Sequence, residues 1–191
     1  MISSKYDWQF ATNFIDEKFL KKAKKAGLEP AAASLLYQRG VQTEEALQEF
    51  LEPGLDQLHD PYDLHDMERA VERIRAAIEN YEQILIYGDY DADGMTSASI
   101  VKEALEQLGA ECQVYLPNRF TDGYGPNSSV YKYFIENQGI SLIITVDNGV
   151  AGLEAIELAQ SLGVDVIVTD HHSMPEELPN AYASVHPEHS G

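Results

Sequence analysis

Cysteine and long apolar runs are both scarce in this sequence. The 191 residues contain one cysteine, Cys112, which excludes an internal disulfide framework and any zinc or iron–sulfur site built from several thiolates. The longest apolar runs, such as 142–146, fall far short of the about 20 residues that cross a bilayer. The N-terminal segment shows no apolar stretch typical of a secretory signal. We therefore expect a cytoplasmic protein that does not contact a membrane.

Basic residues are also few. Lys and Arg number 13 against 32 Asp and Glu, which gives a net charge of −19 with histidine neutral. This balance excludes a broad basic face of the kind that binds nucleic-acid phosphates. If the ligand is a polyanion, bound divalent cations would have to supply the positive charge. The alternative is that the acidity serves only solubility.

The pattern of apolar residues divides the chain into two regions. Residues 1–81 are expected to form a small helical N-terminal region, and residues 82–191 an α/β core in which strands and helices alternate. Such alternation predicts a parallel sheet with helices on both faces. The expected helices are 18–26, 30–38, 43–51, 66–81, 96–108, 128–137 and 153–162. The expected strands are 84–87, 112–116, 142–146 and 164–168, with 182–185 as a fifth. In the N-terminal arm, Tyr6, Trp8 and Phe10 are expected to anchor it on the body.

Acidic and imidazole side chains follow three of the expected strands. They are Asp89, Asp91 and Asp93 after 84–87, Asp147 after 142–146, and Asp170, His171 and His172 after 164–168. Ligands of such sheets bind outside the carboxyl ends of the strands, so these clusters are expected to meet at one edge. A single acid at a strand end is often only a helix N-cap, but three clusters on one edge predict a metal site.

The first cluster also has the Asp-x-Asp-x-Asp-Gly pattern that begins a calcium-binding EF-hand loop. An EF-hand requires Glu at the twelfth position, which here is Ile100, and a helix rather than a strand before the loop. We reject the EF-hand interpretation.

The residue types point to a particular metal chemistry. Asp91 and Asp93 are expected in an irregular turn from which both reach one centre, while Asp147 has two oxygens that can bridge two cations. His171 adds an imidazole nitrogen. Mixed oxygen and nitrogen ligands suit Mn²⁺ or Mg²⁺ better than Zn²⁺. Two such ions about 3.5–4 Å apart can stabilise the attacking and leaving oxygens of a phosphoryl transfer.

Three segments carry a resemblance to a known family. Residues 87–97, 145–149 and 169–172 resemble the first three motifs of the DHH phosphoesterase superfamily. The intervening 116–125 and the upstream 58–67 are similar to the bacterial members that degrade single-stranded DNA. The combination in this order is far more specific than any one motif.

The resemblance implies a Mn²⁺- or Mg²⁺-dependent exonuclease. Such an enzyme would hydrolyse single-stranded DNA in the 5′–3′ direction and release mononucleotides during recombination and repair, with a single-strand-binding protein and a helicase as further partners. Carried over by motif, the metal ligands are Asp91, Asp93, Asp147 and His171, and the acids that orient them are Asp89 and Asp170. His172 would meet the scissile phosphate or its hydroxide; the alternative is a structural partner of Asp170.

The loop 117–127 is expected to bind the substrate. Arg119 could clamp a phosphate with its planar guanidinium, and Tyr124 could stack on a base of any sequence. The alternative is that Gly123 and Gly125 simply make a tight turn on which Tyr124 packs.

Two departures from the family pattern affect these expectations. Tyr87 stands where many relatives have histidine, which would leave the first metal site less complete. The family also has a fourth motif and a separate substrate-binding domain, and this sequence ends before both. We therefore expect an N-terminal portion that by itself binds metal weakly and cleaves little or nothing.

Two other functions compete with the exonuclease. One is a phosphodiesterase for short oligonucleotides or cyclic dinucleotides, which the long region before the first motif disfavours. The other is an inactive relative that scaffolds replication, which the complete set of acids up to residue 172 disfavours.

Overall fold

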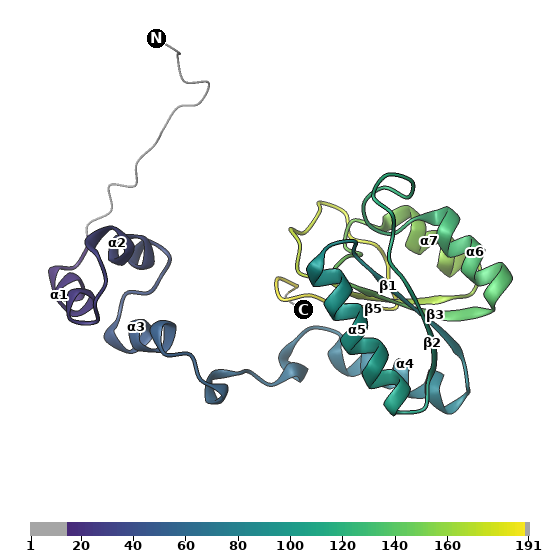
Figure 1. Cartoon of the computed structure of the whole chain (residues 1–191), viewed down its shortest axis with the longest axis horizontal. Coiled ribbons are helices and arrows are strands. Elements are labelled where there is room, and N and C mark those ends of the chain that lie inside the picture. Colours follow the sequence, from purple (N-terminus) through teal and green to yellow (C-terminus); the bar gives the residue numbers. More distant parts are fainter. Residues whose placement is uncertain (1–14, 190–191) are drawn as a thin grey trace, which may run out of the picture. The chain divides into compact units, whose positions relative to one another are not determined.

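The computed structural model describes residues 15–189, which fall into two compact units (Figure 1). The first comprises the described residues up to His59, and the second begins at Asp60. The expected anchors Tyr6, Trp8 and Phe10 lie outside the described residues. None of the helices in the described part of the chain combines the length and the apolar character needed to cross a membrane.

The first unit is helical, as predicted. It contains α1 (Glu17–Lys25), α2 (Pro30–Gln38), α3 (Glu44–Leu51) and the short 3-10 helix η1 (Leu55–Gln57). Its small core is formed by Phe19, Ala23, Ala33 and Leu47. Side-chain caps begin two of the helices: Asp16 accepts from the N–H of Lys18, and Thr43 from that of Ala46.

The second unit is an α/β structure around a five-stranded parallel sheet, which confirms the predicted fold class. Its helices are η2 (Pro61–Asp63), α4 (Met67–Glu79), α5 (Ala92–Gln107), α6 (Ser128–Gln138) and α7 (Leu153–Ser161). Its strands are β1 (Gln83–Gly88), β2 (Glu111–Tyr115), β3 (Ile140–Val146), β4 (Asp165–Thr169) and β5 (Ala183–Val185). They lie in the order β2-β1-β3-β4-β5, and all pairs are parallel.

Successive residues of β1 face opposite sides of the sheet, as the pleat requires. Ile84 and Ile86 pack in a core with α4 and α5, whereas Leu85 and Tyr87 pack in a second core with α6 and α7. Figure 1 shows these two helix pairs on opposite faces. Because both faces are covered, the central strands β1 and β3 are largely buried and consist mostly of apolar residues, the composition that marked them in the sequence.

Helix α4 belongs to the α/β unit rather than to the helical region in which the sequence prediction placed it. Ala70 and Ala77 of α4 are buried in the same core as the strand residues Ile84 and Ile167. The division of the chain therefore falls before Asp60 instead of after residue 81. Amphipathic spacing predicted this helix correctly but gave no information about which unit its apolar face would contact.

The register brings the carboxyl ends of the strands to one level. Gly88 pairs with Val146, Val146 with Thr169, and Thr169 with Val185. Each of the first three strands in this series is followed at once by an aspartate, namely Asp89, Asp147 and Asp170. The sheet thus fixes the starting points of the three acidic segments side by side.

Arg73 ties α4 to the sheet through two carboxylates. Its Nη2 donates to Glu82 Oε2 at 2.7 Å, and its Nε donates to Asp165 Oδ2 at 2.6 Å. The hydroxyl of Ser141 on β3 also donates to Glu82, at 2.9 Å. The bond from Arg73 holds the pKa of Glu82 below its ordinary value. The network joins α4 to the starts of β1, β3 and β4.

We expect Arg73→Met to lower the free energy of unfolding by about 2 kcal/mol at pH 7, because two partly buried carboxylates lose a charged hydrogen-bond donor. The pKa of Glu82 is depressed in the folded state, so this stabilisation is present above pH 4.5 and is lost as the pH falls below that value. Urea unfolding at pH 7 and at pH 3.5 measures both effects. Lys102→Met, which removes an exposed i,i+4 pair with Glu106, should leave stability nearly unchanged at both pH values. Equal losses in the free energy of unfolding of the two variants would show that the bonds of Arg73 do not stabilise the α/β unit.

Candidate metal centre

The segment after β1 bends sharply around two glycines. Gly88 and Gly94 leave no room for a Cβ, because one at Gly94 would collide with the backbone of Asp89, and one at Gly88 would meet the side chain of Leu116. This close packing of the first turn of α5 on the strand end buries Asp89, which is only 2% exposed. Asp89 Oδ1 accepts from the N–H of Tyr90 at 2.7 Å. The glycines therefore bring an acidic side chain to the base of the site.

The prediction of an irregular turn over residues 91–93 is wrong, because α5 begins at Ala92 and not at residue 96. Asp91 is the N-cap: its Oδ1 accepts from the N–H groups of Asp93 and Gly94 at 2.9 and 3.1 Å. Both cap bonds are accepted by Oδ1, so they leave Oδ2 of Asp91 available to bind a metal ion. Asp93 lies on the exposed first turn of the helix instead. Asp91 and Asp93 therefore lie at the N-cap and in the first turn of a helix rather than in an irregular turn.

Asp147 follows β3 in a conformation that few residues adopt. Its φ is 63°, in the left-handed region, and its N–H donates to the carbonyl of Thr169 at 3.0 Å. Next to it, the buried amide of Asn148 donates to the carbonyls of Val146 and Tyr87 at 3.2 and 3.4 Å. These bonds join the ends of β3, β4 and β1 and hold the carboxylate of Asp147 over the sheet edge.

Asp170 organises the segment after β4. Its Oδ1 accepts from the N–H groups of His171 and His172 at 2.7 and 3.0 Å and lies 2.8 Å from His172 Nδ1. Its Oδ2 accepts from the N–H of Val150 at 3.0 Å. With both oxygens engaged, the carboxylate orients the imidazole of His172 and fixes the backbone of His171.

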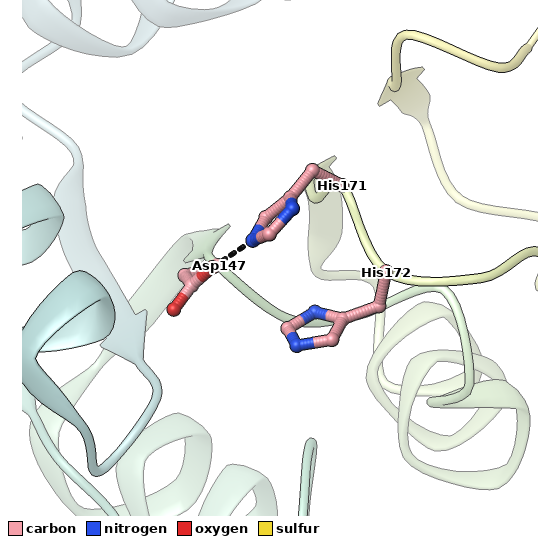
Figure 2. Close-up of side chains that lie close together, drawn as sticks. All are labelled: Asp147, His171 and His172. Atoms are coloured by element: carbon pink, nitrogen blue, oxygen red, sulfur yellow. Dashed lines mark hydrogen bonds and ion pairs between the residues drawn. The ribbon is translucent and has the colours of Figure 1, made fainter. Parts of the chain in front are cut away.

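Two clusters of possible metal ligands share Asp147. One joins Asp147 to Asp89 and Asp91, and the other joins it to His171 and His172; in each, one ligand atom from every residue lies within 4.8 Å of the others. Figure 2 shows the second cluster, with Asp147 Oδ1 2.8 Å from His171 Nε2 and the ring of His172 beside them. The shared carboxylate is the arrangement expected of a residue that bridges two cations.

The structure brings together most of the predicted site residues but not all of them. Asp91, Asp147 and His171, predicted as ligands, lie in the clusters, and so do Asp89 and His172, to which other roles were assigned. Asp93 is in neither cluster. Its role as a ligand stays a prediction.

The electrostatics of the site divide its acids into two kinds. Burial raises the pKa of Asp147, and the nearby charge of Asp91 raises it further, although the contact with His171 opposes the shift. Burial also acts to raise the pKa of Asp170, but its four hydrogen bonds outweigh that effect and lower it. The contact with Asp170 raises the pKa of His172. Hydrogen bonds from the protein thus stabilise Asp170 as an anion. The interactions around Asp147 do not fully offset the cost of burying its charge.

The loop 117–127 contacts the site at two points. The guanidinium of Arg119 lies 5.1 Å from the ring centre of Tyr90, and the ring of Tyr124 meets that of His172 edge-on at 6.0 Å. Tyr87, the residue that departs from the family pattern, is fully buried and donates its hydroxyl to the carbonyl of Gly125 at 3.0 Å. Tyr87 therefore anchors this loop.

Sequence reasoning missed an apolar groove of about 380 Å³ beside the metal clusters. It runs from Asp147 and His171 along residues of α5 and of the segment around β5, including Ile100, Val101, Val185 and Pro187. Ile100 of α5 was the one sign of this groove in the sequence. Its significance became clear only in the structure, where it is exposed beside the sheet.

Comparisons with known proteins agree with this arrangement. The family model described as the DHH family, N-terminal domain, matches residues 83–191, and the chain belongs to the DHH family. The single-stranded-DNA-specific exonuclease RecJ of Bacillus subtilis (strain 168) is 42% identical over 191 residues, which is 100% of this chain and 24% of the relative. RecJ of Escherichia coli (strain K12) is 39% identical over 164 residues, 85% of this chain and 27% of the relative.

Solved structures give the same result. A crystal structure of exonuclease RecJ bound to manganese superimposes with a TM-score of 0.62 at 31% identity, over 68% of this chain and 33% of that one. RecJ from Thermus thermophilus in complex with Mn²⁺ gives a TM-score of 0.61 at 28% identity, over 88% of this chain and 23% of that one. The chain thus spans about a quarter of the length of its curated relatives. The resemblance seen in the motifs is confirmed.

We expect Gly94→Ala to cost about 3 kcal/mol in the free energy of unfolding, because the added methyl group can be accommodated only by moving the backbone of Asp89. Gly109→Ala is the matched control: it places Ala at a φ of +86° with nothing within 4 Å, so it should cost only about 1 kcal/mol. Urea unfolding of both variants measures the difference. A cost for Gly94→Ala no larger than that of the control would show that the close approach of helix and strand is unimportant.

Proposed function

We propose that this chain carries the metal centre of a Mn²⁺- or Mg²⁺-dependent exonuclease that hydrolyses phosphodiester bonds of single-stranded DNA in the 5′–3′ direction. The observation that carries the proposal is the pair of ligand clusters that share Asp147 at the carboxyl edge of the sheet. Membership of the DHH family and the identity to RecJ exonucleases from several bacteria support the substrate and the reaction.

The donor set fits divalent metal ions of this class. Asp89, Asp91 and Asp147 offer carboxylate oxygens, and His171 offers an imidazole nitrogen. Such mixed oxygen and nitrogen ligands suit Mn²⁺ and Mg²⁺, and the only cysteine, Cys112, lies on β2 outside the clusters. A pair of these ions, when bound, supplies charge stabilisation to the attacking and leaving oxygens of a phosphoryl transfer. Burial and the charge of Asp91 raise the pKa of Asp147, and a bound cation would favour the ionised form of this carboxylate.

Protein side chains around the clusters are suited to hold the substrate and to move a proton. His172 is fixed by Asp170 through Nδ1, so Nε2 is free to face a phosphate or the water that attacks it. The contact with Asp170 raises the pKa of His172, and a protonated ring at this position could donate to a phosphate oxygen. Tyr124 lies against this ring and Arg119 lies on Tyr90, positions from which they can contact a base and a phosphate.

The proposal includes the setting in which the enzyme acts. Single-stranded DNA during recombination and repair is supplied by unwinding and is covered by single-strand-binding protein, so a helicase and that protein are the proposed partners. The single free cysteine supports the reducing cytoplasm as the place of action.

We expect Mn²⁺ to raise the melting temperature of this chain. At a metal concentration one hundredfold above Kd, linkage gives about 2.7 kcal/mol, which corresponds to about 5 °C or more. Asp147→Asn should abolish most of this shift without lowering the melting temperature in the absence of metal, because it removes a buried charge next to Asp91. Differential scanning calorimetry with and without Mn²⁺ provides the measurement. Glu157→Gln, the same change on the exposed face of α7, should keep the full shift; if both variants respond alike, the site is not at Asp147.

The reaction itself is tested in a chimera, because the chain spans about a quarter of its relatives' length. Residues 1–191 replace the matched segment of Bacillus subtilis RecJ, and the product is incubated with Mn²⁺ and single-stranded DNA labelled at the 5′ end. We expect release of labelled mononucleotides, at least a hundredfold slower with Asp91→Ala or His171→Ala because a metal ligand is lost. Duplex DNA and a cyclic dinucleotide serve as competing substrates. Faster cleavage of either, or undiminished release by both variants, would refute the proposal.

A further inference from the structure

Phe120 is the most exposed large apolar side chain of the described residues, at 96%. It lies in the loop 117–127, which leaves the end of β2 and returns to α6 (Figure 1). Water contact with a whole phenyl ring forgoes about 2 kcal/mol that burial would give. A phenyl ring held exposed to water suggests that Phe120 contacts a bound molecule.

The loop that carries Phe120 is closely hydrogen-bonded. Asp122 Oδ2 accepts from the hydroxyl of Tyr115 at 2.7 Å and from the N–H of Asn118 at 2.8 Å. Asn118 Oδ1 in turn accepts from the N–H of Phe120 itself at 2.9 Å, and Asn118 O accepts from the N–H groups of Thr121 and Asp122. These bonds fix the backbone on both sides of the ring. The exposure of Phe120 is therefore a product of the loop's structure.

The neighbours of Phe120 connect it to the metal centre. Arg119 precedes it and lies on Tyr90, beside the buried Asp89, and Tyr124 follows it and meets His172. The loop is also joined to β1 through the bond from Tyr87 to Gly125. A ligand held at the metal clusters by one phosphate would extend past these residues.

The scarcity of basic side chains limits how this edge of the sheet can hold such a ligand. Arg119 is the only Lys or Arg in the segments that follow the carboxyl ends of the five strands, in a chain of net charge −19. Ion pairs with phosphates, which supply most of the affinity in basic DNA-binding proteins, are therefore almost lacking at this edge. Stacking on aromatic rings is worth about 1–3 kcal/mol per base and is independent of charge.

We propose that Phe120 is a stacking platform for an unpaired nucleobase of the DNA strand whose phosphate lies at the metal clusters. The inference rests on the proposed exonuclease function and adds to it the residue that distinguishes single strands. A base in a duplex has both faces covered by its neighbours, whereas a base in a single strand can swing out and cover the ring. Arg119 would neutralise the adjoining phosphate.

The test is binding of this 191-residue chain to two fluorescein-labelled probes in Mn²⁺. One is an oligothymidylate with phosphorothioate linkages that resist cleavage, and the other is the same backbone with abasic sites. We expect Phe120→Ala to weaken binding of the base-containing probe about tenfold and to leave the abasic probe unaffected. Phe120→Trp should restore the affinity, and Phe120→Leu should not. Tyr81→Ala removes a ring that is 82% exposed before β1, at the opposite edge of the sheet, and should change neither affinity.

The outcomes separate this inference from the function on which it rests. If the unaltered chain binds the oligothymidylate and Phe120→Ala binds both probes as tightly as before, stacking is refuted while the exonuclease proposal stands. If Phe120→Ala weakens both probes equally, the ring does not contact a base and stacking is also refuted. If the unaltered chain binds neither probe, the stacking inference is refuted, whereas the exonuclease function is decided separately by nucleotide release from the chimera. The dependence of affinity on salt should be the same for Phe120→Ala as for the unaltered chain, because no charge is lost.

Discussion

The structure depends on how several buried carboxylates are tolerated at one edge of a sheet. Asp89, Asp147 and Asp170 follow three neighbouring strands, and all three are buried. Taking an ionised carboxylate out of water costs several kcal/mol unless bonds or opposite charges compensate it. The protein compensates Asp170 with backbone N–H groups and His172, whereas His171 and the charge of His172 do not offset the burial of Asp147 and the repulsion from Asp91. The uneven compensation separates Asp170, which orients its neighbours, from Asp147, which we propose as a metal ligand.

The parallel sheet is what makes this concentration of charge possible. Antiparallel strands would send alternate ends to opposite edges, whereas β1, β3 and β4 all end at the same level. The apolar cores on both faces, together with the tie from Arg73 to Glu82 and Asp165, hold that level in place. Stability stored in the body of the α/β unit thus offsets the unfavourable electrostatics at its edge, which is a common relation between a fold and its functional site.

Periodicity and strand-end chemistry predicted the fold and most of the site. Short apolar runs located the strands, and the acids behind them located the edge. Two errors had different physical origins. The boundary after residue 81 was wrong because the contact partner of α4 depends on packing at long range, and the turn at residues 91–93 was wrong because the N-cap bonds of Asp91 start α5 early. Local pattern does not report the packing of α4 or the close approach of Gly94 that buries Asp89, whereas the N-cap bonds of Asp91 are local and could have been inferred from the acid at the strand end.

The acidity of the chain becomes understandable once the possible sources of attraction for DNA at this edge of the sheet are compared. A nucleic acid cannot be drawn to the site by the protein's own charge, since the surface repels it and Arg119 is the only Lys or Arg in the segments after the strands. In the proposed function, cations held by the clusters at Asp147 reverse the sign locally, so a phosphate is attracted only where it can be cleaved. Aromatic side chains of the loop 117–127 then hold the strand without adding charge. Under the proposed function, this arrangement would give the chain little general affinity for DNA and would make binding conditional on metal and on exposed bases.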